Sequence, residues 1–179
     1  MTTLPRPGDT ETFRELFETH GERMKGVAYQ LLRNHSDAED AVQEAFLKAC
    51  RGAGSFRGGS AVSTWVYRIL VNACHDLRRR RSSREDSLEP DDSKVILAGN
   101  TAGATSNRLR IELEQALDQI HPMNRTVFVL FEVEGFRHNE IGEMLGIPEG
   151  TSRNLLFRAK RELQETLVRR SRALEGGIT

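Results

Sequence analysis

Apolar residues return every three or four positions along most of the chain, which is the spacing of one face of an α-helix. In the first half this spacing predicts three helices, over 13–32, over 36–52 and from Ser60 or Ser63 to about 81. Ser36 and Glu39 form a capping box, in which a serine hydroxyl and a glutamate three residues later satisfy the free N–H groups of a helix start. We therefore expect Ser36 to cap the second helix.

The second half carries shorter helical patterns, over 109–120, 127–134 and 140–145, and a longer one from near Thr151 to about 167. Pro122, Gly135 and Gly146 separate them, because proline lacks the helical N–H donor and glycine readily leaves the helix. No segment alternates apolar and polar residues between hairpin turns. The pattern thus predicts an all-α fold.

Two polar stretches interrupt the helices. The first runs from Gly52 to Ser60 and holds four glycines in nine residues, which excludes regular structure. The second, 82–106, is rich in Ser, Asp, Glu, Gly, Asn and Thr, as linkers are. We predict two small helical domains, 10–81 and 107–174, joined by a flexible linker over 82–106.

Composition narrows the class of protein. The chain has 179 residues and 20.2 kDa, and 29% of the residues are charged and 37% hydrophobic, which suits one or two compact modules rather than a disordered chain. It has no run of eighteen apolar residues and no apolar segment near its start. We therefore expect a soluble cytoplasmic protein. Cys50 and Cys74 lie inside helical patterns and are expected to be buried structural thiols, with a redox role as the alternative.

The net charge is zero, from 26 basic and 26 acidic residues, but the charge is sorted along the chain. Acidic groups gather at 37–44 and 85–92, and basic groups at 78–84 and 153–172. This distribution implies several partners of different charge. Because a neutral chain gains little long-range attraction to nucleic acid, any DNA contact should be local and assisted by another macromolecule.

A tight turn over 146–150 between two helical patterns is typical of a helix-turn-helix, whose second helix enters the DNA major groove. Thr151 is expected to cap that helix, and one broad side of it carries Arg153, Asn154, Phe157, Arg158 and Lys160. Arginine and asparagine suit bidentate contacts with guanine and adenine edges. The alternative is an ordinary helical hairpin with a solvated basic face.

Two further features allow both a DNA-binding and a structural interpretation. The arginine run 78–81 could neutralise phosphates or complement the dipole of the helix that it ends. Phe56 and Arg57 in the glycine-rich loop, with Trp65 nearby, offer an aromatic group and a cation for an unpaired base. Trp65 also has apolar neighbours at helical spacing, which favours a place in the core.

Four blocks of the chain, in order, resemble a known family. The blocks are Asp37-Ala-Glu-Asp-Ala-Val-Gln-Glu-Ala-Phe46, Ser55-Phe-Arg-Gly-Gly-Ser60, Thr64-Trp-Val-Tyr-Arg-Ile-Leu-Val-Asn72 and Gly135-Phe-Arg-His-Asn-Glu-Ile-Gly-Glu-Met-Leu-Gly-Ile-Pro-Glu-Gly-Thr151. They look like the extracytoplasmic-function (ECF) sigma factors of bacterial RNA polymerase, from about Phe13 to Leu167. The resemblance implies a sigma-two helical bundle over 10–81 and a sigma-four helix-turn-helix domain over 107–174.

The resemblance also implies partners and sites. Binding to the clamp helices of the polymerase beta-prime subunit, beside contacts with the beta subunit, is implied for Asp37, Glu39, Asp40, Gln43 and Glu44. Recognition and melting of the minus-ten promoter element are implied for Phe56, Arg57, Ser60, Trp65, Arg68 and Asn72. Reading of the minus-thirty-five element is implied for Thr151, Arg153, Asn154, Phe157, Arg158 and Lys160. An anti-sigma factor is a further partner expected from the resemblance.

The chain departs from the family pattern in the helix-turn-helix. Ser152 stands where an apolar residue is usual, and Leu155 where arginine is common. Arg137-His-Asn139 replaces the more usual Ser-Tyr-Glu type of sequence, which leaves the cap of the first helix of the motif in question. These departures predict that the recognition helix lies at a slightly different position, or reads DNA slightly differently, than in other members of the family.

The linker can be compared with the promoter. About 25 residues reach roughly 80 Å when extended and average about 27 Å as a flexible coil. Promoter elements about one and a half helical turns apart lie roughly 50 Å from each other. The linker is long enough to span that distance but too flexible to keep the two domains at that separation. We therefore expect the polymerase to position the two domains.

Two other classes of protein compete with this interpretation. A stand-alone helix-turn-helix regulator would share the motif, but it needs neither a melting loop nor an acidic polymerase-binding block. An enzyme is disfavoured, because the acidic block and His35 lack a second convergent set of ligands, and the adjacent Cys74 and His75 point in different directions on a helix. We expect no catalysis, no metal and no cofactor.

Overall fold

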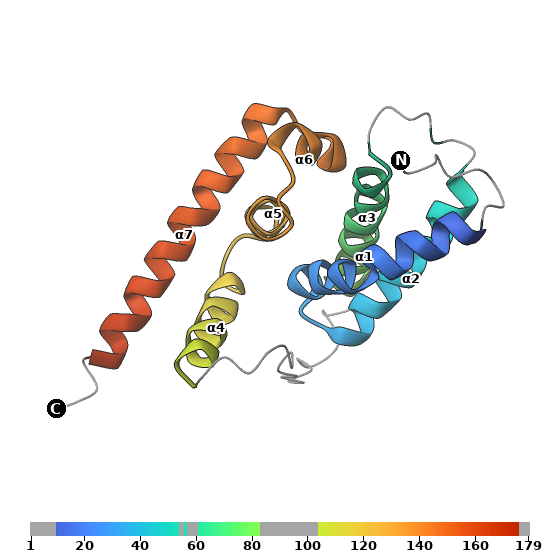
Figure 1. The fold of residues 1–179 in the computed structure, drawn as a ribbon. Helices are drawn as coiled ribbons and strands as arrows, with labels where there is room; N and C mark the ends of the chain where they lie inside the picture. The colour runs from blue at the N-terminus through green and yellow to red at the C-terminus, as the bar shows by residue number, and fades with distance from the viewer. Residues whose placement is uncertain (1–9, 54–55, 57–60, 83–103, 176–179) are drawn as a thin grey trace.

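The computed structural model describes residues 10–53, 56, 61–82 and 104–175, and in these ranges every regular element is helical (Figure 1). The prediction of an all-α fold is confirmed. The elements form two lobes, with α1 to α3 in the first and α4 to α7 in the second. None of the described helices combines the length and apolar character that a bilayer span requires.

The first lobe consists of α1 (Thr10–Leu32), α2 (His35–Gly52) and α3 (Val62–Ser82). Helix α2 packs against both α1 and α3 and turns a stripe of small residues inward: Ala38, Ala41, Val42, Ala45 and Ala49. Small side chains let the neighbouring helices approach closely. Their larger residues, such as Met24 on α1 and Leu70 on α3, fill the remaining space and are fully buried.

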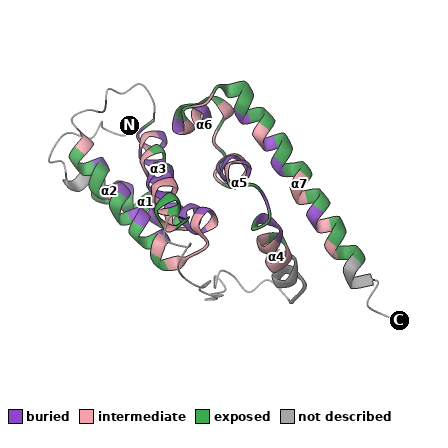
Figure 2. Ribbon diagram, turned by 180° about the vertical axis from the view of Figure 1, so that it is seen from behind, coloured by how far each residue is buried: buried purple, intermediate pink, exposed green. Residues whose placement is uncertain are grey.

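The second lobe consists of α4 (Ala104–Leu117), α5 (Pro122–Phe128), the π-helical segment η2 (Val129–Val133), α6 (His138–Leu145) and α7 (Glu149–Glu175). Helix α7 has 27 residues and runs along the outside of this lobe (Figures 1 and 2). It packs on α4, α5 and α6 through buried residues such as Leu156 and Ala159. Gly146 ends α6 with φ of 66°, a left-handed conformation that glycine adopts without steric cost.

Three sequence predictions about local structure were wrong. Helix α2 is capped by Asn34, whose side chain accepts a hydrogen bond from the Asp37 N–H at 2.9 Å, and Ser36 lies inside the helix. Asparagine and serine cap equally well, so the backbone path after α1 decides between them. Helix α7 begins at Glu149, which makes Thr151 an exposed residue of its first turn and not its cap.

The third error concerns a cysteine. Cys50 is exposed, because the buried stripe of α2 passes through Ala49 and leaves the next position on the outer side. Cys74 is buried as predicted. Burial raises the pKa of the Cys74 thiol to about 12, so this thiol stays protonated and unreactive.

The two lobes pack against each other, which the sequence pattern did not predict. One connected apolar core contains Leu70 of α3 together with Leu130 of η2 and Ile141 of α6. Helix α3 lies against α6, and α1 touches α5 and η2. The protein is therefore closed, with the sigma-two-like and sigma-four-like lobes in direct contact (Figure 2).

Candidate nucleic-acid and protein interfaces

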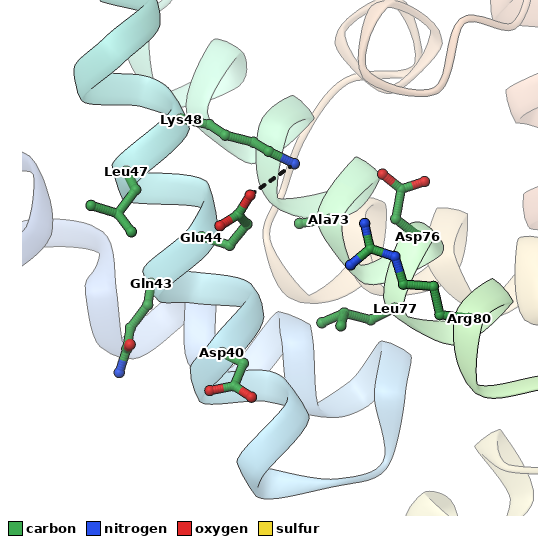
Figure 3. A pocket seen from close by; sticks show the side chains of 9 residues that line it. All are labelled: Asp40, Gln43, Glu44, Leu47, Lys48, Ala73, Asp76, Leu77 and Arg80. Atoms are coloured by element: carbon green, nitrogen blue, oxygen red, sulfur yellow. Dashed lines mark ion pairs between the residues drawn. The ribbon is translucent and has the colours of Figure 1, made fainter. Parts of the chain in front are cut away.

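A groove between α2 and α3 collects three of the five predicted polymerase-binding residues. Asp40, Gln43 and Glu44 line it beside the exposed Leu47, and Leu77 and Arg80 of α3 line the opposite side (Figure 3). Positions 40, 43, 44 and 47 follow helical spacing, so they share one face of α2. The groove measures about 290 Å³ and combines acidic, apolar and basic groups, which suits a few side chains of another protein.

The other two acidic residues lie outside this groove. Asp37 accepts a hydrogen bond from Arg81 at 3.1 Å, which ties the start of α2 to the end of α3. Glu39 is exposed and is not among the groove-lining residues. Part of the arginine run therefore has a structural task within the lobe, since Arg81 holds Asp37 and Arg79 pairs with Asp76 at 2.7 Å.

The described minus-ten candidates lie on and beside one side of α3. Arg68 and Asn72 are exposed, and Trp65 is half-buried at the same helical face. The Phe56 ring packs on the Trp65 ring with centroids 5.1 Å apart, and both rings touch the core. Both aromatic residues thus combine a packing role with partial exposure. Arg57 and Ser60 lie outside the described residues.

Helix α7 presents its predicted DNA-reading residues on an exposed surface. These residues are Thr151, Arg153, Asn154, Phe157, Arg158 and Lys160. The Phe157 side chain is 68% exposed, whereas Leu156 and Ala159 on the inner face are buried. An exposed phenylalanine among cations is available for apolar contact with a thymine methyl group.

Two of these cations are engaged within the lobe. Arg153 pairs with Glu149 one turn earlier on α7, and Lys160 pairs with Glu132 of η2 at 2.6 Å. Among the described residues Arg158 has no ion-pair partner. Because an exposed ion pair contributes little free energy, a phosphate can replace the carboxylate beside Arg153 or Lys160.

Two residues that depart from the family pattern in the helix-turn-helix, His138 and Ser152, contact each other. The Ser152 hydroxyl is fully buried and lies 2.9 Å from His138 Nδ1. The His138 ring also stacks on Phe131. Burial of His138, with help from Arg153, lowers the pKa of its imidazole. Glu140 completes the start of α6 by accepting a hydrogen bond from the Arg137 N–H at 2.8 Å.

The contact between the lobes is centred on Glu134, which sequence reasoning did not single out. Its carboxylate, 6% exposed, accepts a hydrogen bond from the Tyr67 hydroxyl at 2.8 Å and pairs with Arg23 at 3.1 Å. The Tyr67 ring also contacts Phe136, with centroids 4.9 Å apart. Burial and the adjacent Glu134 carboxylate raise the pKa of the Tyr67 phenol, which remains a hydrogen-bond donor.

Two further polar contacts join the lobes. Thr64 of α3 donates a hydrogen bond to Glu140 of α6 at 3.3 Å, and Arg33 after α1 donates to Asp118 at 3.0 Å. Glu134 lies at the end of η2, where its N–H donates a π-type hydrogen bond to the Val129 carbonyl at 3.1 Å.

Comparison with known proteins identifies the family. The chain matches the family models "Sigma-70 region 2" over residues 16–84 and "Sigma-70, region 4" over residues 110–163. It is 35% identical over 160 residues to the ECF RNA polymerase sigma factor SigM of Mycobacterium tuberculosis, covering 89% of this chain and 79% of SigM. It is 34% identical over 168 residues to the RNA polymerase sigma factor CarQ of Myxococcus xanthus, covering 90% of this chain and 92% of CarQ.

A solved structure agrees with the sequence relatives. The sigma factor RpoE from Bartonella quintana, in complex with the anti-sigma factor NepR, superposes with a TM-score of 0.73 at 25% identity, covering 87% of this chain and 96% of RpoE. Both lobes and both sequence regions thus correspond to one family of transcription factors that have no enzymatic activity. The chain belongs to the ECF sigma factors of RNA polymerase.

Proposed function

We propose that this ECF sigma factor binds core RNA polymerase through the α2–α3 groove and directs it to promoters that α3 and α7 recognise. The observation that carries the proposal is the exposed face of α7, where Arg153, Asn154, Phe157 and Arg158 stand together on the second helix of a helix-turn-helix. This set combines donors for base edges, an apolar contact and a cation for phosphate. In this proposal α7 reads the minus-thirty-five element as duplex DNA.

Core binding is assigned to the groove side of α2. Asp40 and Glu44 are exposed, and Glu44 forms an ion pair with Lys48 of the next turn at 3.2 Å (Figure 3). Leu47 adds an exposed apolar side chain at the same face. An interface that combines an apolar anchor with charged groups at its margin suits a basic helical surface such as the polymerase clamp helices. Asp37 contributes through its ion pair with Arg81, which holds α2 and α3 together at one end.

The minus-ten element is assigned to α3 and the preceding loop. Arg68 and Asn72 offer hydrogen bonds, and Phe56 with Trp65 offers aromatic surface beside them. A base that leaves the duplex stack needs such a combination, because stacking and hydrogen bonds replace what it loses. In this proposal the melted base is held beside the first half of α3.

The lobes must separate when both promoter elements are bound. In the closed structure Thr64, at the start of α3, is hydrogen-bonded to Glu140 of the helix-turn-helix. The two DNA-reading surfaces are therefore much closer than the roughly 50 Å between promoter elements one and a half helical turns apart. The closed structure represents the sigma factor before it binds a promoter. The protein acts in the cytoplasm, where RNA polymerase is found.

An anti-sigma factor is the proposed regulator of this closed form. RpoE, whose fold matches both lobes here, was solved in complex with the anti-sigma factor NepR. A partner that binds across both lobes of the present chain would keep them in contact and keep the polymerase from placing them on a promoter. The closed arrangement of the lobes supports this proposal.

In vitro transcription with purified core RNA polymerase tests the proposal. Fragments that include the upstream region of this gene serve as templates, with core alone and sigma factor alone as controls. We expect initiation at defined sites only when both proteins are present. A salt-sensitive shift of the same DNA by this protein alone, without initiation, would instead indicate a stand-alone regulator.

A further inference from the structure

The His138 side chain joins both helices of the helix-turn-helix to the preceding segment η2. The Nδ1 atom of His138, the first residue of α6, lies 2.9 Å from the Ser152 hydroxyl in the first turn of α7. The same imidazole stacks on Phe131 of η2, with ring centroids 4.4 Å apart and the ring planes at 20°. Because Ser152 is fully buried, its hydroxyl depends on a partner inside the protein.

A second close contact lies one helical turn further along α6. A methyl group on Gly142 would lie 2.7 Å from the carbonyl oxygen of Ile147, so the turn before α7 rests directly on the α6 backbone. His138 and Gly142 are four residues apart and therefore share one face of α6. Helix α6 thus meets the following segment at two points along its length. A methyl group on Gly142 would also lie 3.6 Å from the backbone nitrogen of Glu149, the first residue of α7, so α6 and α7 meet at two places and the angle between them is restrained.

The hydrogen bond also restrains the rotation of α7 about its own axis. Ser152 is followed directly by Arg153 and Asn154, and successive residues of a helix are turned by about 100°. Any rotation that breaks the bond from Ser152 to His138 moves both DNA-facing side chains. An apolar contact at Ser152 would be less directional, because hydrophobic burial does not depend on angle but a hydrogen bond does.

The charge state of His138 supports the direction of this bond. Burial and the nearby cations Arg153 and Lys160 disfavour the imidazolium, and Glu149 opposes them. The lowered pKa favours the neutral ring, and in the tautomer that carries its proton on Nε2 the Nδ1 atom accepts a hydrogen bond from the Ser152 hydroxyl.

Resting on the proposed role of α7 at the minus-thirty-five element, we propose that His138 and Ser152 form a positioning pair that sets the orientation of α7 and thereby its discrimination between promoter sequences. Neither residue needs to touch a base. They act through Arg153 and Asn154, whose place depends on how α7 is turned. The two residues are therefore coupled, and losing either partner should have the same consequence as losing both.

The test measures discrimination with the full-length protein in the holoenzyme. Transcription is compared on two promoters that differ only in the bases of the upstream element, and the ratio of the two initiation rates is the readout. The variants are Ser152→Ala, His138→Phe, which keeps an aromatic ring on Phe131 but removes the acceptor, and the double variant. Thr166→Ala is the matched control, since it removes another buried α7 hydroxyl far from the turn.

We expect each single variant to lower the ratio by about 5-fold, as for the loss of one oriented hydrogen bond, and the double variant to lower it no further. Thr166→Ala should leave the ratio unchanged. His138→Asn places an amide oxygen near the position of Nδ1 and should retain more of the ratio than His138→Phe. This comparison gives a result even where one substitution reduces the yield of folded protein.

Three outcomes would overturn the proposal. Unchanged ratios in both single variants would show that the pair does not position α7. Effects that multiply in the double variant would show two independent structural losses. A wild-type ratio of one would contradict the reading of the upstream element by α7 itself, which distinguishes failure of the proposed function from failure of the pair alone.

Discussion

Replacing Tyr67 with phenylalanine should loosen the contact between the lobes without changing either lobe. The substitution removes only the hydroxyl that donates to the Glu134 carboxylate at 2.8 Å. The ring remains, with its contacts to Phe136 and to His20 of α1. Because Tyr67 and Glu134 belong to different lobes, the lost hydrogen bond counts almost entirely against the closed arrangement.

The size of the effect follows from the burial of Glu134. Its side chain is 6% exposed, so water replaces the lost partner poorly, and a hydrogen bond to a charged group contributes about 1.5–3 kcal/mol. The remaining pair with Arg23 is weaker, because the Arg23 side chain is 56% exposed. Since about 1.4 kcal/mol changes an equilibrium tenfold, the ratio of separated to closed lobes should rise about 10- to 100-fold.

Energy transfer between two dyes measures that ratio directly. Cys50 on α2 is exposed and takes one dye, and an introduced cysteine at the exposed position Gln164 of α7 takes the other. Cys74 is buried and does not compete for label in the folded protein. The wild type should give high transfer efficiency in solution, and Tyr67→Phe should add a population of low efficiency.

Tyr29→Phe is the matched control, because Tyr29 is a buried α1 tyrosine whose ring stacks on His35 within the first lobe. This variant should keep the wild-type distribution of distances. The reasoning would be refuted by an unchanged distribution in Tyr67→Phe at full labelling, or by an equal shift in the control. Either result would mean that the Tyr67 hydroxyl does not hold the lobes together.

Four further predictions follow from single groups. Arg158→Ala should weaken recognition of the upstream element by about 1–3 kcal/mol in holoenzyme binding assays with normal core affinity, and a loss of core affinity would contradict the assignment. Asp40→Ala should lower the affinity for core polymerase in a titration, and an altered promoter preference at normal affinity would contradict it. A thiol reagent should modify Cys50 rapidly and Cys74 only after unfolding, because burial raises the pKa of Cys74 to about 12. Burial lowers the pKa of His75, so as the pH falls the unfolded chain binds a proton at this histidine before the folded protein does, near pH 6.5. The free energy of unfolding, measured in urea titrations, should therefore fall as the pH drops below that value. His75→Gln should reduce the change of this free energy with pH.

The helices and their solvent-facing sides follow from the sequence because helix formation is local. Each helix repeats a spacing of three to four residues, and the pattern of α7 already separates the inner Leu156 and Ala159 from the outer Arg153 and Arg158. The stop of α6 at Gly146 is local as well, since one residue supplies the left-handed turn. The acidic face of α2 follows from the same spacing.

The local sequence pattern does not show which of two nearby residues of similar chemistry caps a helix or is buried. Asn34 and Ser36 are both good caps, and only the path of the chain after α1 shows that Asn34 holds the Asp37 N–H. Cys50 and Cys74 both sit among apolar residues, but the exact angle of the buried stripe leaves Cys50 outside. Such differences of one or two positions depend on packing against the rest of the lobe.

The sequence by itself determined the all-helical class, the two lobes, the family and the exposed face of α7, because each of these features leaves a periodic pattern or a contiguous motif in the chain. Tertiary structure alone decided that the lobes are closed on each other. Tyr67 and Glu134 are 67 residues apart, and His138 and Ser152 lie on different helices 14 residues apart. Periodicity shows which face of a helix is buried but not which other helix covers it, so contacts of this kind emerge only when the helices pack.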